Sequence, residues 1–111
     1  MSQARFVLRA AAQRDIDSLA DYLETEAGKE VAQRFIDAAQ ASFVALAAAP
    51  HLGPAVPTKL TDLAGLRKWR VSGFSNVLIF YRPENERIRI FRVLHGAQDW
   101  LDLLDVANGD T

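Results

Sequence analysis

The fold is decided by residues 66–99, which read LRKWRVSGFSNVLIFYRPENERIRIFRVLHGAQD. This stretch predicts three consecutive strands. We expect these strands over residues 66–71, 77–82 and 87–94, with turns at Ser72-Gly73 and over Pro83–Glu86. Short β-rich runs bounded by Gly, Pro, Asn and Ser are the usual signals of strands and hairpins. Connections as short as these make neighbouring strands antiparallel.

The second and third predicted strands are apolar on both faces. The run Val77–Tyr81 has no polar interruption, and strict alternation would divide the third strand into Ile88, Ile90 and Leu94 on one face and Phe91 and Val93 on the other. An antiparallel sheet covered by helices on one side usually alternates between apolar and polar residues. Two explanations remain open: the second apolar face is an interaction surface, or the C-terminal tail folds back and buries it.

Length, composition and charge describe one soluble domain with an uneven charge distribution. The 111 residues suffice for a single core, and the lack of cysteine excludes disulfides and thiolate metal sites. No signal-peptide pattern or membrane-spanning stretch is evident, so we expect a cytoplasmic protein without membrane association. Residues 59–96 carry 8 basic and 3 acidic side chains, and residues 97–111 carry 4 acidic and none basic. The basic region can attract an acidic protein segment or a phosphate backbone, or it can be a solvated face opposite the acidic tail.

The first half of the chain predicts one short strand and two helices. Phe6–Leu8 is an apolar run suited to a strand at the sheet edge or beside the last strand. Apolar residues at helical spacing predict a first helix from about residue 11 to Gly28, and a second over residues 29–48. So short a break between them predicts an antiparallel hairpin lying across one face of the sheet. Residues 50–65 form a loop whose length suggests function or mobility.

These elements give an α+β fold in the order β-α-α-β-β-β. The N-terminal helical hairpin packs on a mainly antiparallel sheet. A short C-terminal helix or tail follows over residues 97–106. Residues 1–106 are expected to form the single domain, and residues 107–111 a disordered tail.

Sequence patterns of catalysis are sparse. His95 ends the last strand and precedes Asp99, so it could act as a general base held by a carboxylate. The alternative is a half-buried histidine bonded to the backbone, and His51 is expected to be a loop residue. No phosphate loop, nucleophile elbow or metal-ligand set is present, so no cofactor or metal is expected.

A series of short motifs extends along nearly the whole chain. Each motif is weak by itself, but the order and spacing of the whole series are specific. They are Asp15-Ile16, Tyr22, Ala32-x-x-Phe35, Phe43-x-x-Leu46, Pro50-x-x-Gly53, Leu63-x-Gly65-Leu66-Arg67-x-Trp69-x-Val71, Gly73-Phe74, Leu78-Ile79-Phe80-Tyr81-Arg82, Ile90-x-Arg92-Val93-Leu94-His95-Gly96 and Asp99. In this order they resemble the ParE family, within the ParE/RelE superfamily of toxins from bacterial type II toxin–antitoxin systems.

The resemblance implies a dedicated ParD-like antitoxin that wraps the toxin with a helix and an extended segment, in a higher-order hetero-oligomer. Large apolar anchors are then needed, because ordering such a segment costs several kcal/mol. We expect the antitoxin to contact three aromatic anchors and three charged partners. These are Trp69, Phe74 and Phe80, with Arg67, Arg82 and Arg92.

The resemblance also bears on activity. RelE-like members cut messenger RNA with basic residues and often a C-terminal tyrosine, but here Ser75-Asn76 and Gln98 stand where arginines are usual, and no tyrosine follows Tyr81. Loss of these groups disfavours stabilisation of a phosphoryl transition state. ParE-like members inhibit DNA gyrase without a catalytic site, so we expect a non-enzymatic gyrase inhibitor that causes growth arrest. We expect the target to contact the end of the last strand at His95, Asp99 and Trp100. The alternatives are a RelE-type endoribonuclease with a divergent site, or a degenerate toxin that only binds its antitoxin.

Overall fold

The computed structural model describes residues 5–57 and 64–96 of the chain. Its elements are β1 (Phe6–Leu8), α1 (Ala10–Ala27), α2 (Lys29–Ala48), β2 (Arg67–Val71), β3 (Phe74–Glu84) and β4 (Arg87–His95). The predicted α+β class and the order β-α-α-β-β-β are confirmed. The predicted C-terminal helix or tail and the predicted disordered end lie outside the described residues.

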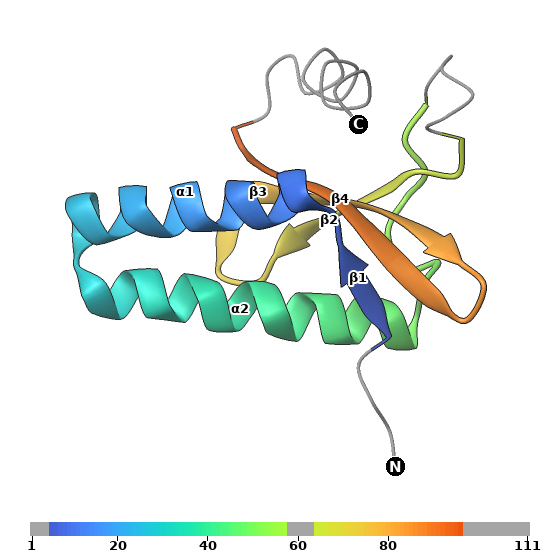
Figure 1. Ribbon diagram of the computed structural model, residues 1–111, viewed down its shortest axis with the longest axis horizontal. Coiled ribbons are helices and arrows are strands. Elements are labelled where there is room, and N and C mark those ends of the chain that lie inside the picture. The colour runs from blue at the N-terminus through green and yellow to red at the C-terminus, as the bar shows by residue number, and fades with distance from the viewer. Residues whose placement is uncertain (1–4, 58–63, 97–111) are drawn as a thin grey trace.

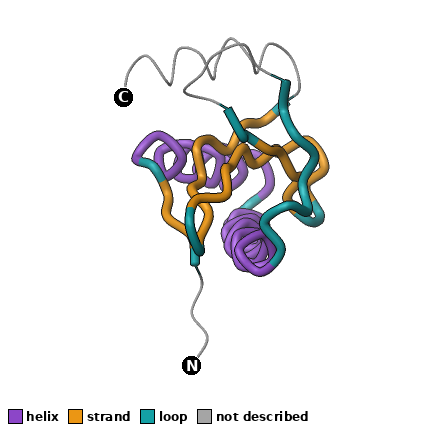
Figure 2. Tube along the Cα trace, turned by 90° about the vertical axis from the view of Figure 1, so that its right-hand side faces the viewer, coloured by secondary structure: helices purple, strands orange, loops and turns teal. Residues whose placement is uncertain are grey.

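The two helices form the predicted hairpin and lie side by side (Figure 1). Gly28 separates them with a φ of 100°, and its backbone N–H bonds to the carbonyl of Glu24, closing the last turn of α1. A positive φ is available to glycine without strain, which is why the chain can reverse direction here. Ile16 of α1 and Phe35 and Phe43 of α2 are buried against the sheet. Figure 2 views α2 almost along its axis and shows the strands passing beside it. No helix in the described part of the chain has the length and hydropathy needed to cross a membrane.

The sheet has the strand order β1-β4-β3-β2. β1 is therefore both an edge strand and the neighbour of the last strand, and it pairs in parallel with β4, while the other two pairings are antiparallel. β3 begins at Phe74, three residues before the predicted start. Pairing of Val71 with Phe74 across the tight turn extends the strand through polar residues that have little strand propensity of their own.

A β-bulge divides the apolar residues of β4 between the two faces. Phe80 pairs with Arg92 and Tyr81 pairs with Ile90, so Phe91 is an extra residue in β4. Beyond the bulge the alternation is reversed: Val93 packs with Ile90 in the helix-side core, and Leu94 packs with Phe91 on the opposite side. The prediction that Leu94 shares a face with Ile90 is therefore wrong, because it assumed strict alternation.

We call the side of the sheet opposite the helices the outer face. Its apolar cluster consists of Val56, Leu66, Leu78, Phe80, Phe91 and Leu94.

Candidate partner-binding surface

The outer face has an apolar centre to which neither helix contributes a residue. Phe80 is fully buried, Phe91 and Leu94 are 4% and 8% exposed, and Leu78 is only partly buried. Among the described residues, Val56 and Leu66 from the loop between α2 and β2 complete the cluster. Among the strand residues of this cluster, Leu78 is thus the one whose apolar side chain is still partly exposed to solvent.

Arginines surround this centre. The guanidinium carbons of Arg9 and Arg82 lie 4.7 and 4.9 Å from the centroid of the Phe91 ring, within the range of cation–π attraction. Partial burial, and then the charges of Arg89, Arg92 and Arg82, lower the pKa of Arg9 from its usual value. Three neighbouring cations that act on one guanidinium indicate a positive local potential.

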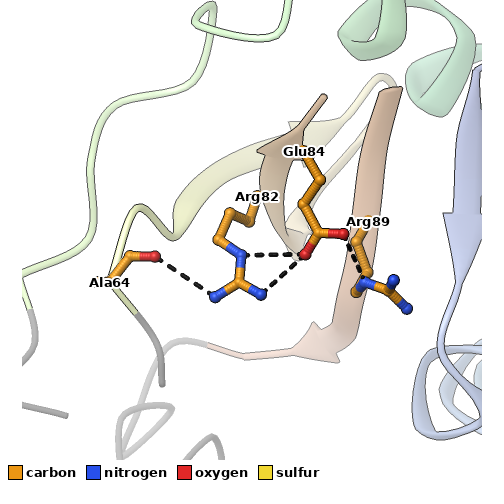
Figure 3. Close-up of polar contacts among 4 residues, drawn as sticks. All are labelled: Ala64, Arg82, Glu84 and Arg89. Carbon is orange, nitrogen blue, oxygen red and sulfur yellow. Dashed lines mark hydrogen bonds and ion pairs between the residues drawn. The ribbon is translucent and has the colours of Figure 1, made fainter. Parts of the chain in front are cut away.

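Glu84 is the carboxylate that joins two of these arginines. Its side chain accepts hydrogen bonds from Arg82 at 2.8 Å and from Arg89 at 2.9 Å, and Arg82 also reaches the carbonyl of Ala64 (Figure 3). Burial alone would raise the pKa of Glu84, but the hydrogen bonds and charges of the two arginines outweigh it and hold this pKa below its usual value. Glu84 therefore remains ionised at neutral pH and orients the arginines on the outer face.

Two further cations come from β2. Lys68 lies opposite Phe80 and Arg70 lies opposite Leu78 in the antiparallel register. Directly opposed residues of an antiparallel pair place their side chains on the same face, so Lys68 and Arg70 extend the basic rim along the outer face.

The six predicted antitoxin contacts are divided between the two sides of the sheet. Phe80 and Arg82 belong to the outer face, as described above. Trp69 and Phe74 pack from the helix side, and the Phe74 ring meets Phe35 of α2 edge to face at 5.5 Å between centroids. Arg67 donates a hydrogen bond to the carbonyl of Gly53 and so holds the loop.

Arg92, the sixth, pairs with α1. Its guanidinium donates to both carboxylate oxygens of Asp15, at 2.6 and 2.8 Å, and the Val93 backbone N–H donates to the same carboxylate at 2.9 Å. The hydrogen bond with Asp15 raises the pKa of Arg92, outweighing the effect of burial. β1 pairs with β4 only over residues 88–90. Asp15 therefore satisfies a backbone donor of β4 just beyond the end of that pairing. Antitoxin binding by all six residues stays a prediction. Arg67, Trp69, Phe74 and Arg92 each have a structural contact of their own.

Sequence patterns missed Arg9, Arg89 and Phe91. The alternating pair Arg89-x-Phe91 was a usable signal, because residues two positions apart in a strand direct their side chains to the same side, and here both lie on the outer face. Arg9 gave no such signal, since it lies far away in sequence and reaches the ring through the parallel pairing of β1 with β4.

The loop before β2 is anchored by Tyr81. The hydroxyl of Tyr81 donates to the carbonyl of Pro50 and accepts from the Gly53 N–H, both at 2.9 Å, in a fully buried position. Burial raises the pKa of this hydroxyl, partly offset by the Gly53 hydrogen bond and the charge of Arg67. The loop residues that cover the outer face are thus held in place from the helix side of the sheet.

Replacing Tyr81 by Phe is expected to lower the free energy of unfolding by about 1–3 kcal/mol, because a buried donor and a buried acceptor lose their partner. Thermal denaturation followed by circular dichroism measures the change. Tyr22→Phe is the matched control, since Tyr22 is 53% exposed and its replacement should change stability by less than about 0.5 kcal/mol. Equal stabilities of the two variants would contradict the anchoring role.

His95, predicted to contact the target, lies exposed at the end of β4. Its ring lies near that of Tyr22 of α1, with centroids 6.1 Å apart. The two line a pocket of about 260 Å³ that also includes Phe74, Ser75 and Asn76. Asp99 and Trp100 lie outside the described residues, so the proposed pairing of His95 with Asp99 stays a prediction. Within the described ranges, no group of three His, Asp or Glu side chains could hold a metal ion.

Comparisons with known proteins agree with this fold. The fold is similar to a chain of a solved chromosomal ParDE toxin–antitoxin system from P. aeruginosa, with a TM-score of 0.68 and 17% identity, over 84% of this chain and 96% of that chain. A comparison with curated protein sequences finds no match. The model of the family described as the ParE toxin of the type II toxin–antitoxin system parDE matches residues 6–100. The chain therefore belongs to the ParE toxin family of type II toxin–antitoxin systems.

Proposed function

We propose that this protein is neutralised by a cognate ParD-like antitoxin that binds the outer face of its sheet. The observation that supports this best is the composition of that face, where an apolar centre is surrounded by five basic side chains. They are Arg9, Lys68, Arg70, Arg82 and Arg89. Apolar anchors with a basic rim suit an acidic amphipathic segment.

The energetics of such a partner fit this surface. A segment that becomes ordered on binding loses conformational entropy worth several kcal/mol, which apolar burial must offset. Leu78 provides apolar surface that is still open to solvent, and the rings beneath it are already fixed. The basic rim accelerates encounter with an acidic segment and sets its orientation. Toxin and antitoxin would then form a hetero-oligomer.

The proposed target of the unbound toxin is DNA gyrase, stalled on cleaved DNA, with the toxin contributing no catalytic chemistry. Membership of the ParE family supports this proposal. So do the uncharged residues Ser75 and Asn76, which stand where RelE-like ribonucleases usually carry arginine. The pocket beside His95 is the candidate contact with the target.

A gyrase cleavage assay tests the proposal. Purified toxin is titrated into gyrase, supercoiled plasmid and ATP, while messenger RNA integrity is followed in a parallel translating extract. Dose-dependent linear plasmid with intact message is the expected result, and addition of the antitoxin should abolish it. Intact plasmid with cleaved message would instead establish a RelE-type ribonuclease. Absence of both effects, together with tight antitoxin binding, would leave a protein that only binds its antitoxin.

A further inference from the structure

β2 is an edge strand, and only part of its outer edge is paired within the described residues. The loop pairs with its first half: the Val56 N–H bonds to the Leu66 carbonyl at 2.9 Å, and the Lys68 N–H bonds to the Pro54 carbonyl at 3.1 Å. This pairing ends at Pro54, because proline has no N–H to donate and the chain turns toward Tyr81 at Gly53.

Arg70 continues the same edge without a backbone partner in the described part of the chain. In an antiparallel ladder every second residue directs its N–H and C=O away from the neighbouring strand. Lys68 directs its N–H away from β3, and Arg70 is two residues further and still in register, opposite Leu78. Arg70 therefore presents one backbone donor and one acceptor outward, and none of the described backbone groups bonds to either.

A groove of about 870 Å³ runs beside this edge. Its lining includes Pro54 at the end of the loop pairing, Trp69 and Arg70 of β2, and Ser72 in the turn that follows β2. The groove is therefore large enough for a few residues of extended chain, and it begins where the loop stops pairing. A strand added here would continue the line of residues 54–56 along β2.

Charge selects the occupant. Three of the five residues of β2 are basic: Arg67, Lys68 and Arg70. If β2 of a second copy paired antiparallel with β2 about Arg70, basic side chains of the two copies would lie opposite each other. Positive charge on an edge strand is known to prevent such self-association. The bulge between Arg70 and Val71 also disfavours a long flat pairing. A short extended segment rich in carboxylates meets neither obstacle.

We propose that a short acidic segment of the antitoxin adds to the sheet as a strand beside β2, hydrogen-bonded to the backbone N–H and C=O of Arg70. This inference rests on the proposed function and specifies how part of the antitoxin binds. Main-chain hydrogen bonds supply affinity in this mode of recognition, while alternate side chains supply specificity. Here Lys68 and Arg70 would select carboxylates, and Trp69 would provide an apolar contact.

Arg70→Pro compared with Arg70→Ala tests the backbone contact. Both variants remove the charge, but only proline removes the outward N–H, and proline is tolerated on an edge strand whose N–H faces solvent. Binding of the purified antitoxin is measured by calorimetry, with thermal denaturation as the check on folding. We expect Arg70→Pro to bind about tenfold more weakly than Arg70→Ala. Equal affinities of two folded variants would overturn the added strand.

Amide hydrogen exchange of the unmodified protein gives a second test that needs no substitution. The Arg70 amide should exchange rapidly in the isolated toxin and become protected in the complex, while the Lys68 amide, bonded to Pro54, serves as the internal control. A complex in which Arg70 stays unprotected overturns the strand but leaves antitoxin neutralisation standing. Protection of Arg70 in a dimer of the toxin alone also overturns it, since the occupant is then a second copy. If the antitoxin does not bind the unmodified toxin, both proposals fall.

Discussion

Asp15→Ala is expected to lower the free energy of unfolding by about 3 kcal/mol, at the low end for breaking a buried ion pair. The side chains of Arg92 and Asp15 are only 18% and 13% exposed. Removing the carboxylate leaves the Arg92 guanidinium and the Val93 N–H without this acceptor. The melting temperature should fall by roughly 15 °C, given about 4–8 °C per kcal/mol for a domain of this size. Thermal and urea denaturation measure both quantities.

Asp17→Ala is the matched control for this substitution. Asp17 lies on the same helix, and its carboxylate accepts one exposed hydrogen bond from Gln13. Both substitutions replace aspartate by the best helix former, so helix propensity changes equally. The control should shift stability by less than about 0.5 kcal/mol. The double variant Asp15→Leu with Arg92→Met should recover the part of the loss that comes from the unpaired charge, because an apolar pair needs no charge compensation, whereas the Val93 N–H still lacks its acceptor. Equal melting temperatures of the two single variants would contradict the structural role of the ion pair.

The strands and helices could be predicted because their signals are local. The turn residues between strands, the helical spacing of Ile16, Leu19 and Leu23, and the glycine between the helices each act within a few positions. The helix bounds agree with the prediction to within about a residue at each end. β3 was predicted too short, because Ser75 and Asn76 have weak strand propensity and only pairing with β2 extends the strand to them.

The face of the sheet on which each side chain lies could not be predicted, because it depends on contacts between residues that are far apart in the sequence. One extra residue at Phe91 reverses the alternation of everything after it in β4. Asp15 and Arg92 lie 77 positions apart, so no local pattern joins them. An arginine within the apolar run of β4 did indicate that a partner was needed, but it did not say which carboxylate would supply it.

The same limit applied to the candidate site. The sequence indicated a basic, apolar sheet surface, and the structure has one, formed around Phe91 by residues from β2, β3 and β4 and by Arg9, which follows β1. The individual anchors depended on the faces, so Trp69 and Phe74 were expected on a partner surface and are found packed against the helix-side core. A partner can reach only the side chains that are exposed on the outer face. Their exposure depends on how the loop and the strands pack together.

Leu78→Glu is expected to raise the dissociation constant for the antitoxin about 100-fold, a loss typical of a central interface residue. Leu78 is the partly buried member of the outer-face cluster, so its replacement leaves the buried rings beneath it in place. The new carboxylate removes apolar contact at the centre of the surface. It also neutralises part of the positive rim, because Arg70 lies directly opposite. Affinity is measured by calorimetry, with melting temperature as the check on folding.

Val44→Glu is the matched control, because Val44 is 47% exposed on α2 and so lies outside the outer face. It introduces the same charge at an exposed apolar position, and its dissociation constant should stay within about threefold of the unmodified protein's, as for residues outside an interface. A loss of affinity specific to Leu78→Glu would place the antitoxin on the outer face. If Leu78→Glu bound as tightly as the control, the antitoxin would have to contact another surface, and the basic rim around Phe91 would need a different partner. The comparison thus separates a docking surface from a merely solvated basic face, the two explanations that charge alone left open.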